Sequence, residues 1–421
     1  GGYTSRMTDV EHTAEDSGDT ITSMMHLLPD DPVWQGRARR IFELFRDLWT
    51  GRNQRGRLMF KSTYFTADRV HPDPDLACDT VYHPRAVQPA LLYWQRTGDG
   101  EMTRLFGEWM RTWVAAAASG ERGKPVGVLP SAIHWPDGGV GGVGESWWDP
   151  RNHTEPTLYS WPSAMSMMTR SLLLTAHMSG DASYLEPARA MARLRAEYLA
   201  HPVEAPEPGS TAWCASRMGF LAETLAKYRL LTGDPAFDGL LWRDANGYVR
   251  LRLGQGRTGL VEDLRRQAEA YGVNREAFCE EVRWTDRLVA FRRYANDFLE
   301  RPLPAVDPGF VYGTVTGDPG GPLYFPMNAV RWRTRPDDIA ALVTDSGTDR
   351  FAAELFHFGE DTRPMGAELF MLAKGAYRWS MANGAGKVLA VSSLDVSGPR
   401  ASIHFELPPR VLCTLTLGPS P

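Results

Sequence analysis

The sequence has little cysteine, no large excess of one charge and no long apolar run. Its four cysteines, Cys78, Cys214, Cys279 and Cys413, are widely spaced, with no CxxC pair and no Cys–His cluster. This spacing indicates neither a small disulfide scaffold nor a zinc finger, and it leaves open whether the cysteines are buried thiols or disulfides. No stretch reaches the ~18 consecutive apolar residues of a membrane-spanning helix.

Charge excludes a further class of protein. The net charge is −5, from 46 basic and 51 acidic residues, and no long run of one sign occurs. Nucleic acid binding requires clustered Lys and Arg, so we expect no nucleic acid partner. The chain begins Gly-Gly-Tyr without a Met, so an export signal that is removed from the protein would not be visible in this sequence.

Segment 126–161 is the most unusual stretch of the chain. It lies between two helical patterns, has no helical period of its own, and contains Trp135, Trp147, Trp148 and Trp161 among many polar residues. Long irregular segments are usually functional or disordered, and disordered segments are poor in aromatic residues. We therefore expect an ordered loop that lines a carbohydrate-binding cleft, with these indoles as flat stacking surfaces for sugars.

Helical hairpins are predicted over most of the chain. Asp31, Asp99, Asp181 and Asp234 each follow an apolar run and a short break, and each precedes a new helical pattern. Such breaks end one helix and allow the Asp to cap the next. Polar-faced helices alternate with more apolar ones, which predicts outer helices around inner ones. We therefore expect an α/α toroid, an incomplete helical barrel, as the catalytic domain over residues 1–300.

A different pattern begins near residue 300. RPLPAVDPG (301–309) is a proline-rich break, and it is followed by short runs rich in β-branched and aromatic residues, such as FVYGTV (310–315) and FAAELFHF (351–358). Turn sequences with Gly and Asp separate these runs. They predict a C-terminal antiparallel β-sheet or sandwich domain over residues 301–421. Two domains also agree with the length of the chain.

A helical-hairpin toroid followed by a β-sheet domain resembles the layout of the α/α-toroid polysaccharide lyases, which include chondroitin, hyaluronate and alginate lyases. Several glycoside hydrolase families use the same toroid. The resemblance rests on helix punctuation and domain order, and fold alone does not give function. It implies a glycan-binding cleft at one end of the toroid. In these lyases an Asn or Arg neutralises the uronate carboxylate, a His or Tyr takes the C5 proton, and a Tyr protonates the leaving oxygen.

Elimination of this kind requires a carboxylate clamp, a base and an acid. The loop before an inner helix (82–85) and the run 151–159 each contain these side-chain types. The expected catalytic residues are His153 or His83 as base, with His134 as a third candidate, Tyr159 or Tyr82 as acid, and Asn152, Arg151 and Arg217 as the clamp. The expected substrate-binding residues are Arg85, Trp135, Trp147, Trp148, Trp161, Trp213, Arg217, Glu145 and Asp149. Any one of these histidines taken alone also fits a hydrogen-bonded loop residue, and Trp213 with Arg217 fits buried packing equally well.

Hydrolysis is the alternative chemistry. It needs two carboxyl groups roughly 5–10 Å apart across the glycosidic bond. Candidates lie in the central loop, in EHTAEDSGD (11–19) and in RWTDR (283–287): Asp137, Glu145, Asp149, Glu11, Glu15, Asp16 and Asp286. The segment 11–19 is also ordinary N-capping sequence for the helix that follows it.

The favoured interpretation is therefore a lyase that eliminates across a uronic-acid-containing polysaccharide. A glycoside hydrolase on the same fold and a non-catalytic glycan-binding protein are the alternatives. No cofactor is required, although His12, His83, His134 and His153 could hold Zn or Ca with neighbouring acids; no HxxxH or EF-hand pattern supports this. A polysaccharide or oligosaccharide is the expected partner, and a secreted or periplasmic location follows from it.

Overall fold

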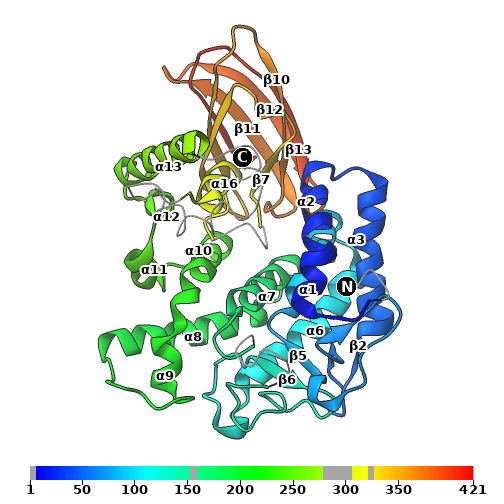
Figure 1. Ribbon diagram of the computed structural model, residues 1–421. Helices are drawn as coiled ribbons and strands as arrows, with labels where there is room; N and C mark the ends of the chain where they lie inside the picture. The colour runs from blue at the N-terminus through cyan, green and yellow to red at the C-terminus, as the bar shows by residue number, and fades with distance from the viewer. Residues whose placement is uncertain (1–5, 152–158, 278–305, 321–326, 421) are drawn as a thin grey trace.

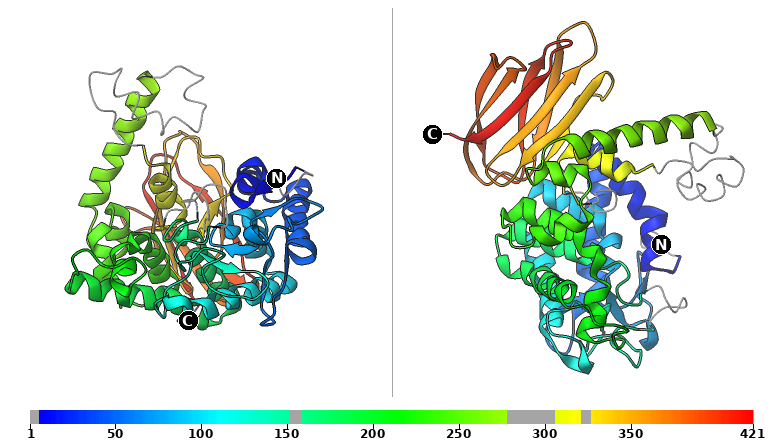
Figure 2. Two further views of the ribbon diagram at one scale, coloured as in Figure 1. Left: turned by 60° about the horizontal axis from the view of Figure 1, so that its bottom comes forward. Right: turned by 90° about the vertical axis from the view of Figure 1, so that its left-hand side faces the viewer.

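The computed structural model describes residues 6–151, 159–277, 306–320 and 327–420, and it consists of a helical part and a C-terminal β part (Figure 1). The two parts lie end to end, with the sheets above most of the helices in Figure 1 and in the right-hand view of Figure 2. The boundary expected near residue 300 lies outside the described residues and stays a prediction. In the described part of the chain, no helix is long and apolar enough to cross a membrane.

The helices of the helical part pack against one another, and several contact a helix that is not their neighbour in the sequence. α5 contacts α2 and α3, α7 contacts α6 and α10, and α8 contacts α10. The predicted toroid itself remains a prediction. The helices are α1 (Val10–Thr13), η1 (Ala14–Gly18), α2 (Asp19–Leu27), α3 (Pro32–Leu44), η2 (Phe45–Trp49), η3 (Pro74–Leu76), α4 (His83–Ala86), α5 (Gln88–Thr97), α6 (Gly100–Ala118), η4 (Glu121–Gly123), α7 (Met165–Ser179), η5 (Ala182–Leu185), α8 (Glu186–Ala200), α9 (Thr211–Ser216), η6 (Met218–Phe220), α10 (Leu221–Thr232), α11 (Asp238–Asp244), α12 (Gly247–Arg252), α13 (Thr258–Ala277) and α16 (Pro308–Thr316).

The helix breaks follow the predicted capping chemistry at three of the four positions. Asp99 accepts hydrogen bonds from the N–H groups of Glu101 and Met102 at the start of α6, after Gly98 has ended α5 in the left-handed conformation. Asp31 and Asp181 cap α3 and η5 in the same way. Asp234 instead caps the turn before α11, because α11 begins four residues later.

Three short antiparallel ladders brace the helical part. β1 (Thr8–Asp9) pairs with β4 (Tyr64–Phe65), β2 (Thr50–Arg52) pairs with β3 (Leu58–Phe60), and β5 (Cys78–Thr80) pairs with β6 (Ala132–His134). The β1–β4 ladder is the one that fixes the start of the described chain. It holds the N-terminal helices α1 and η1 against the rest of the helical part.

The C-terminal part consists of two antiparallel sheets, as predicted. One has the order β13-β10-β7 and the other β12-β11-β14-β9-β8. Side chains alternate along β9 between buried and half-buried positions, and Trp379 of one sheet lies 6.1 Å from Phe405 of the other. The strands are β7 (Val330–Trp332), β8 (Ile339–Ser346), β9 (Phe351–His357), β10 (Arg363–Leu369), β11 (Gly375–Asn383), β12 (Val388–Val396), β13 (Ala401–Leu407) and β14 (Cys413–Pro419).

One expected strand is a helix. FVYGTV (310–315) lies inside α16, although its Val, Tyr and Phe favour strands. Asp307 accepts a hydrogen bond from the N–H of Phe310, Pro308 occupies the first turn, and Gly317 ends the helix in the left-handed conformation. These three capping signals outweigh the β propensity of the residues between them.

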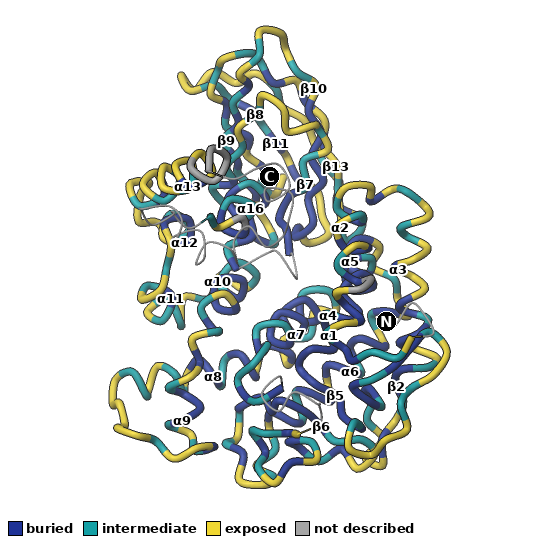
Figure 3. Tube along the Cα trace, viewed as in Figure 1, coloured by how far each residue is buried: buried dark blue, intermediate teal, exposed yellow. Residues whose placement is uncertain are grey.

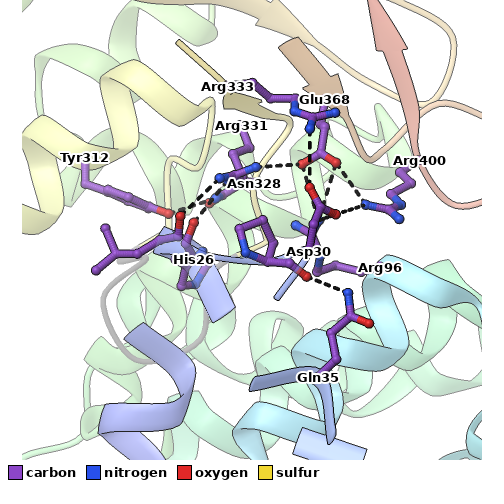
Figure 4. Close-up of polar contacts among 12 residues, drawn as sticks. His26, Asp30, Gln35, Arg96, Tyr312, Asn328, Arg331, Arg333, Glu368 and Arg400 are labelled. Carbon is purple, nitrogen blue, oxygen red and sulfur yellow. Dashed lines mark hydrogen bonds and ion pairs between the residues drawn. The ribbon is translucent and has the colours of Figure 1, made fainter. Parts of the chain in front are cut away.

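The two parts have separate hydrophobic cores, and Figure 3 shows buried backbone running through both. Polar side chains join them (Figure 4). Glu368 of β10 is 2% exposed and accepts hydrogen bonds from Arg400 (2.9 Å), Arg331 (3.2 Å) and Arg96 of α5 (3.3 Å). Asp30, in the turn before α3, contacts Arg333 and Arg400. We call these six residues the Glu368 network.

The cysteines of the described chain are free. Cys78, Cys214 and Cys413 are buried thiols, and Cys279 lies outside the described residues. Burial raises the pKa of Cys78 and Cys214, to about 12 for Cys214. These three cysteines therefore serve as small apolar side chains of the core.

Candidate functional site

The N-terminal helices present a histidine held by a buried aspartate. Asp9 is the last residue of β1, caps α1 through the N–H of His12, and lies 2.8 Å from Nδ1 of the same histidine. The hydrogen bond to Asp9 and the charge of Asp9 raise the pKa of His12. Because Asp9 is buried and the ring is half exposed, Nδ1 is held and Nε2 is the nitrogen available for proton transfer.

Two glutamates follow on the same segment. Glu11 lies on α1 and Glu15 on η1, which is π-helical; such turns are rare and occur frequently at functional sites. Glu11 is half-buried, and burial raises its pKa, with a further rise from the charge of Glu15. Glu15 lies 3.9 Å from Arg85, which also bonds Asp19 at 2.8 Å. The side chain of Asp16 lies outside the described residues.

Tyr82 and Tyr159 meet at this place. Their rings are 5.1 Å apart in an edge-to-face arrangement, and the hydroxyl of Tyr82 lies 3.1 Å from that of Ser163. Burial raises the pKa of both phenols, and Glu11 raises them further. The two rings therefore stay neutral and can donate hydrogen bonds near neutral pH. We call Glu11, Glu15, Tyr82, Arg85 and Tyr159 the Glu11 cluster.

His83 stands in the core rather than in this cluster. Its ring has no exposed surface and stacks on Phe60 with centroids 4.0 Å apart. Nδ1 accepts from the N–H of Thr80 at 2.8 Å, and Nε2 lies 3.2 Å from the carbonyl oxygen of Ser62. Both nitrogens are thus engaged, so the expected role of His83 as a base does not fit its position; it anchors α4 and so orients Tyr82 and Arg85.

The tryptophans of the central loop pack on one another. Trp147, Trp161 and Trp213 are each at most 8% exposed, and Trp161 lies 5.3 Å from Trp213 and 6.1 Å from Trp147. Other rings and the protein interior take up their faces, so these three indoles fix the loop against α9 rather than offer surfaces for sugars. Trp148 remains half-buried beside Trp213, and Arg217 lies over Trp213 at 4.6 Å.

The other predicted residues lie elsewhere in the loop. His134 lies 3.0 Å from the exposed Asp137, and the half-buried Trp135 packs against Gly51 of β2. Glu145 is exposed. Asp149 bonds Arg151 at 3.1 Å, and Arg151 has a positive φ of 47°. Asn152, His153 and Asp286 lie outside the described residues.

The structure thus brings together Tyr82, Arg85 and Tyr159 from the lyase prediction and Glu11 and Glu15 from the hydrolase prediction. The sequence reasoning missed Asp9 and Ser163. A signal existed for Asp9, because an Asp three residues before a His at a helix start is the pattern of an N-cap that can also reach the ring. Across the described chain, no three His, Cys, Asp or Glu side chains are grouped so as to hold a metal ion.

The chain has only weak similarity to known proteins. No family model and no curated protein matches the chain. A Paenibacillus polymyxa xyloglucanase of glycoside hydrolase family 44 is 11% identical over 20% of this chain and 17% of its own, with a TM-score of 0.16. CelM2, a bifunctional glucanase-xylanase from a metagenome library, is 14% identical over 58% and 50%, and a putative alpha-N-acetylgalactosaminidase from Bacillus halodurans is 14% identical over 61% and 63%, both at 0.16. Scores this low carry no conclusion about fold or function.

Proposed function

We propose that the protein hydrolyses glycosidic bonds of a neutral glycan, with Glu11 as the proton donor and Glu15 as the second carboxyl group. The observation that carries the proposal is the half-buried Glu11 beside Glu15, Tyr82 and Arg85. Glycoside hydrolysis uses one carboxyl group kept protonated by its surroundings and one that is ionised. Tyr82, as a neutral phenol, would donate a hydrogen bond to a sugar hydroxyl group, and the buried Tyr159 would hold the ring of Tyr82 in place.

The charge of this region favours a neutral substrate. Four carboxyl groups lie here beside two basic side chains, Arg85 and His12: Asp9, Glu11, Glu15 and Asp19. A uronate polymer carries a negative charge on each acidic sugar, and an excess of carboxylates repels it. The guanidinium of Arg85 is already engaged by Asp19 and Glu15, so a uronate would have to displace them.

Elimination on a uronic-acid-containing polysaccharide is the second candidate, and the Asp9–His12 pair favours it. In that reaction His12 would take the C5 proton, Tyr82 would protonate the leaving oxygen, and Arg85 would neutralise the uronate. His12→Asn would then abolish turnover, whereas under hydrolysis it would change kcat less than tenfold. The two chemistries leave different products, which makes them separable.

The test is a panel of neutral and uronic-acid polysaccharides, assayed for new reducing ends and for ultraviolet absorbance of a new double bond. We expect reducing ends from a neutral glycan without absorbance, and a loss of roughly 10²–10⁴-fold in kcat for Glu11→Gln, the size of a general acid's contribution. Glu197→Gln, an exposed glutamate of α8, is the matched control and should keep full activity. Both variants should keep the melting temperature.

Three results would contradict the proposal in different ways. Ultraviolet absorbance from a new double bond would show that the reaction is elimination and not hydrolysis. Full activity of Glu11→Gln would remove Glu11 from the reaction. Binding of a glycan without any product would favour the non-catalytic glycan-binding interpretation, with the partly exposed Trp135 and Trp148 as the first residues to test.

A further inference from the structure

A second hollow lies far along the chain from the Glu11 cluster. α10, α11 and α12 lie close together below the C-terminal sheet (Figure 1), and a cavity of about 80 Å³ opens between them and β8. Five of the side chains that line it are apolar, and we call them its floor: Ala226, Leu230, Leu241, Val249 and Leu253. Ala226, Leu241 and Val249 are buried, so this side of the cavity belongs to the protein interior.

The remaining lining is mainly polar and cationic. Arg229, Arg252 and Arg350 line it with Asp345 and Ser346. Arg350 and Asp345 are about half exposed, whereas the side chain of Arg252 is 9% exposed. The cavity therefore has its mouth at Arg350 and Asp345 and its inner end at Arg252.

The three arginines differ in what already holds them. Arg229 bonds Asp238 through Nε, and Arg350 bonds both Asp345 and Asp349. These two guanidinium groups therefore have close carboxylate partners of their own.

Arg252 has neutral hydrogen-bond partners instead. It donates to the hydroxyl of Tyr248 at 3.2 Å and to Oγ and the carbonyl oxygen of Ser346 at 2.9 and 3.1 Å. Its Nε is buried without a hydrogen-bond partner, and its ion pair with Asp345 is long, at 3.7 Å, to a carboxylate that also bonds Arg350. A buried charged donor without a hydrogen bond is costly, and an acceptor on a ligand in the cavity would satisfy it.

From this geometry we propose that the cavity is a binding site for a short-chain carboxylate. The carboxylate accepts hydrogen bonds from Arg252, and its alkyl part lies on the floor formed by Leu241 and Val249. One water occupies about 10–15 Å³ of such a volume, so the cavity of about 80 Å³ holds a molecule of about five to eight non-hydrogen atoms, a range that includes butyrate. An inorganic anion would leave its hydration shell against the apolar floor, which disfavours phosphate and sulfate.

The site is independent of the proposed hydrolysis. Its residues come from α10, α11, α12 and β8, so a bound carboxylate would add to the hydrogen bonds from Arg252 to Ser346 that already join α12 to the C-terminal sheet. A ligand that binds only the folded protein raises its melting temperature by mass action. Binding and stability can both be measured without any glycan substrate.

The experiment is equilibrium dialysis of the full chain against radiolabelled butyrate at constant ionic strength. We expect one saturable site per chain, displaced by unlabelled butyrate but not by butyramide, which has the same size without the charge, nor by inorganic phosphate. The melting temperature should rise with butyrate and stay unchanged with butyramide.

Two variants and one control test the residues. Arg252→Met should weaken binding about 10- to 100-fold, the range for a hydrogen bond to a charged group. Ala226→Leu should abolish binding by filling the floor while leaving every guanidinium in place, and it serves if Arg252→Met folds poorly. Arg250→Met, on the exposed side of α12, should bind like the unchanged protein.

The proposal is overturned by any of four results. The first is the absence of saturable binding up to about 20 mM butyrate, a limit that corresponds to a binding free energy of about 2.3 kcal/mol. The second and third are displacement of butyrate by butyramide or by phosphate as readily as by unlabelled butyrate. The fourth is unchanged binding in both Arg252→Met and Ala226→Leu.

Discussion

The Glu368 network and the Glu11 cluster are both groups of charged side chains, but they are built in opposite ways. Around Glu368 the arginines outnumber the carboxylates, and the central carboxylate is 2% exposed with three guanidinium donors. Around Glu11 the carboxylates outnumber the basic groups, and Glu11 itself is half-buried with a raised pKa. A fully satisfied buried charge holds its neighbours in place, whereas a partly exposed carboxyl group with a raised pKa can exchange a proton.

The largest expected effect is a loss of stability at the Glu368 network, which joins the helical part to the C-terminal part. Glu368→Gln leaves Arg96, Arg331 and Arg400 without their shared carboxylate, and breaking a buried ion pair costs about 3–5 kcal/mol. We expect this loss in the free energy of unfolding, measured by urea denaturation, with separate transitions for the two parts if the joint opens first.

Glu406→Gln is the matched control, because Glu406 is exposed on the neighbouring strand β13. It should change stability by less than about 0.5 kcal/mol. If Glu368→Gln also stayed within this range, the Glu368 network would not be a structural joint, and the contrast with the Glu11 cluster would disappear.

The second largest expected effect is a loss of stability at acidic pH. His26 lies on α2 beside the Glu368 network, and burial, together with the charges of Arg96 and Arg331, lowers its pKa from 6.5 to about 4. The unfolded chain therefore binds the proton first as the pH falls. Stability present above pH 6.5 is lost between pH 6.5 and about 4, by about 2–3 kcal/mol.

His26→Gln should remove this part of the pH dependence, measured as melting temperature from pH 7 to pH 4. The exposed His201 provides the control, since His201→Gln should keep the acid-induced loss. An unchanged pH profile in His26→Gln would show that the acid sensitivity arises elsewhere in the protein.

The smallest effect concerns the Glu11 cluster. The charge of Glu15 is one cause of the raised pKa of Glu11, so Glu15→Gln should lower it. Activity that needs protonated Glu11 would then be lost at a lower pH, and the alkaline limb of kcat/KM should move down by about 0.5–1 pH unit.

Glu15 is also the proposed second carboxyl group, so Glu15→Gln will have low activity. The alkaline limb of its kcat/KM profile is therefore measured on this residual activity. Asp19→Asn is the comparison variant, since Asp19 bonds Arg85 but is not a cause of the shift at Glu11. A limb that stays in place in Glu15→Gln would mean that the limb does not report Glu11.

Local patterns predicted the elements better than they predicted the site. Asp99, with Gly98 before it, gave both ends of a helix break, and the apolar stripe of α6 at Met102, Phe106, Trp109 and Trp113 is buried. The strand predicted at 310–315 is a helix because Asp307, Pro308 and Gly317 decide its ends. These signals act within a few residues of the chain, so the sequence contains them.

The site depends on contacts that no local pattern records. Tyr82 and Tyr159 are far apart in the sequence, yet their rings lie 5.1 Å apart. Trp161 and Trp213 are likewise distant and cover each other's faces, which turns expected sugar platforms into core. The sequence around His83 suggests a loop histidine, but in the folded protein its ring stacks on Phe60 and its Nε2 lies beside the carbonyl oxygen of Ser62.

The β1–β4 ladder has a consequence for how the protein would fail on heating. It consists of two residue pairs, Thr8 with Phe65 and Asp9 with Tyr64, and it ties down the segment that carries Glu11 and His12. Segments held by few backbone pairs open at a lower free energy than the body of a protein. Activity would therefore disappear several degrees before the fold melts, and it would return on cooling as soon as this segment closed again.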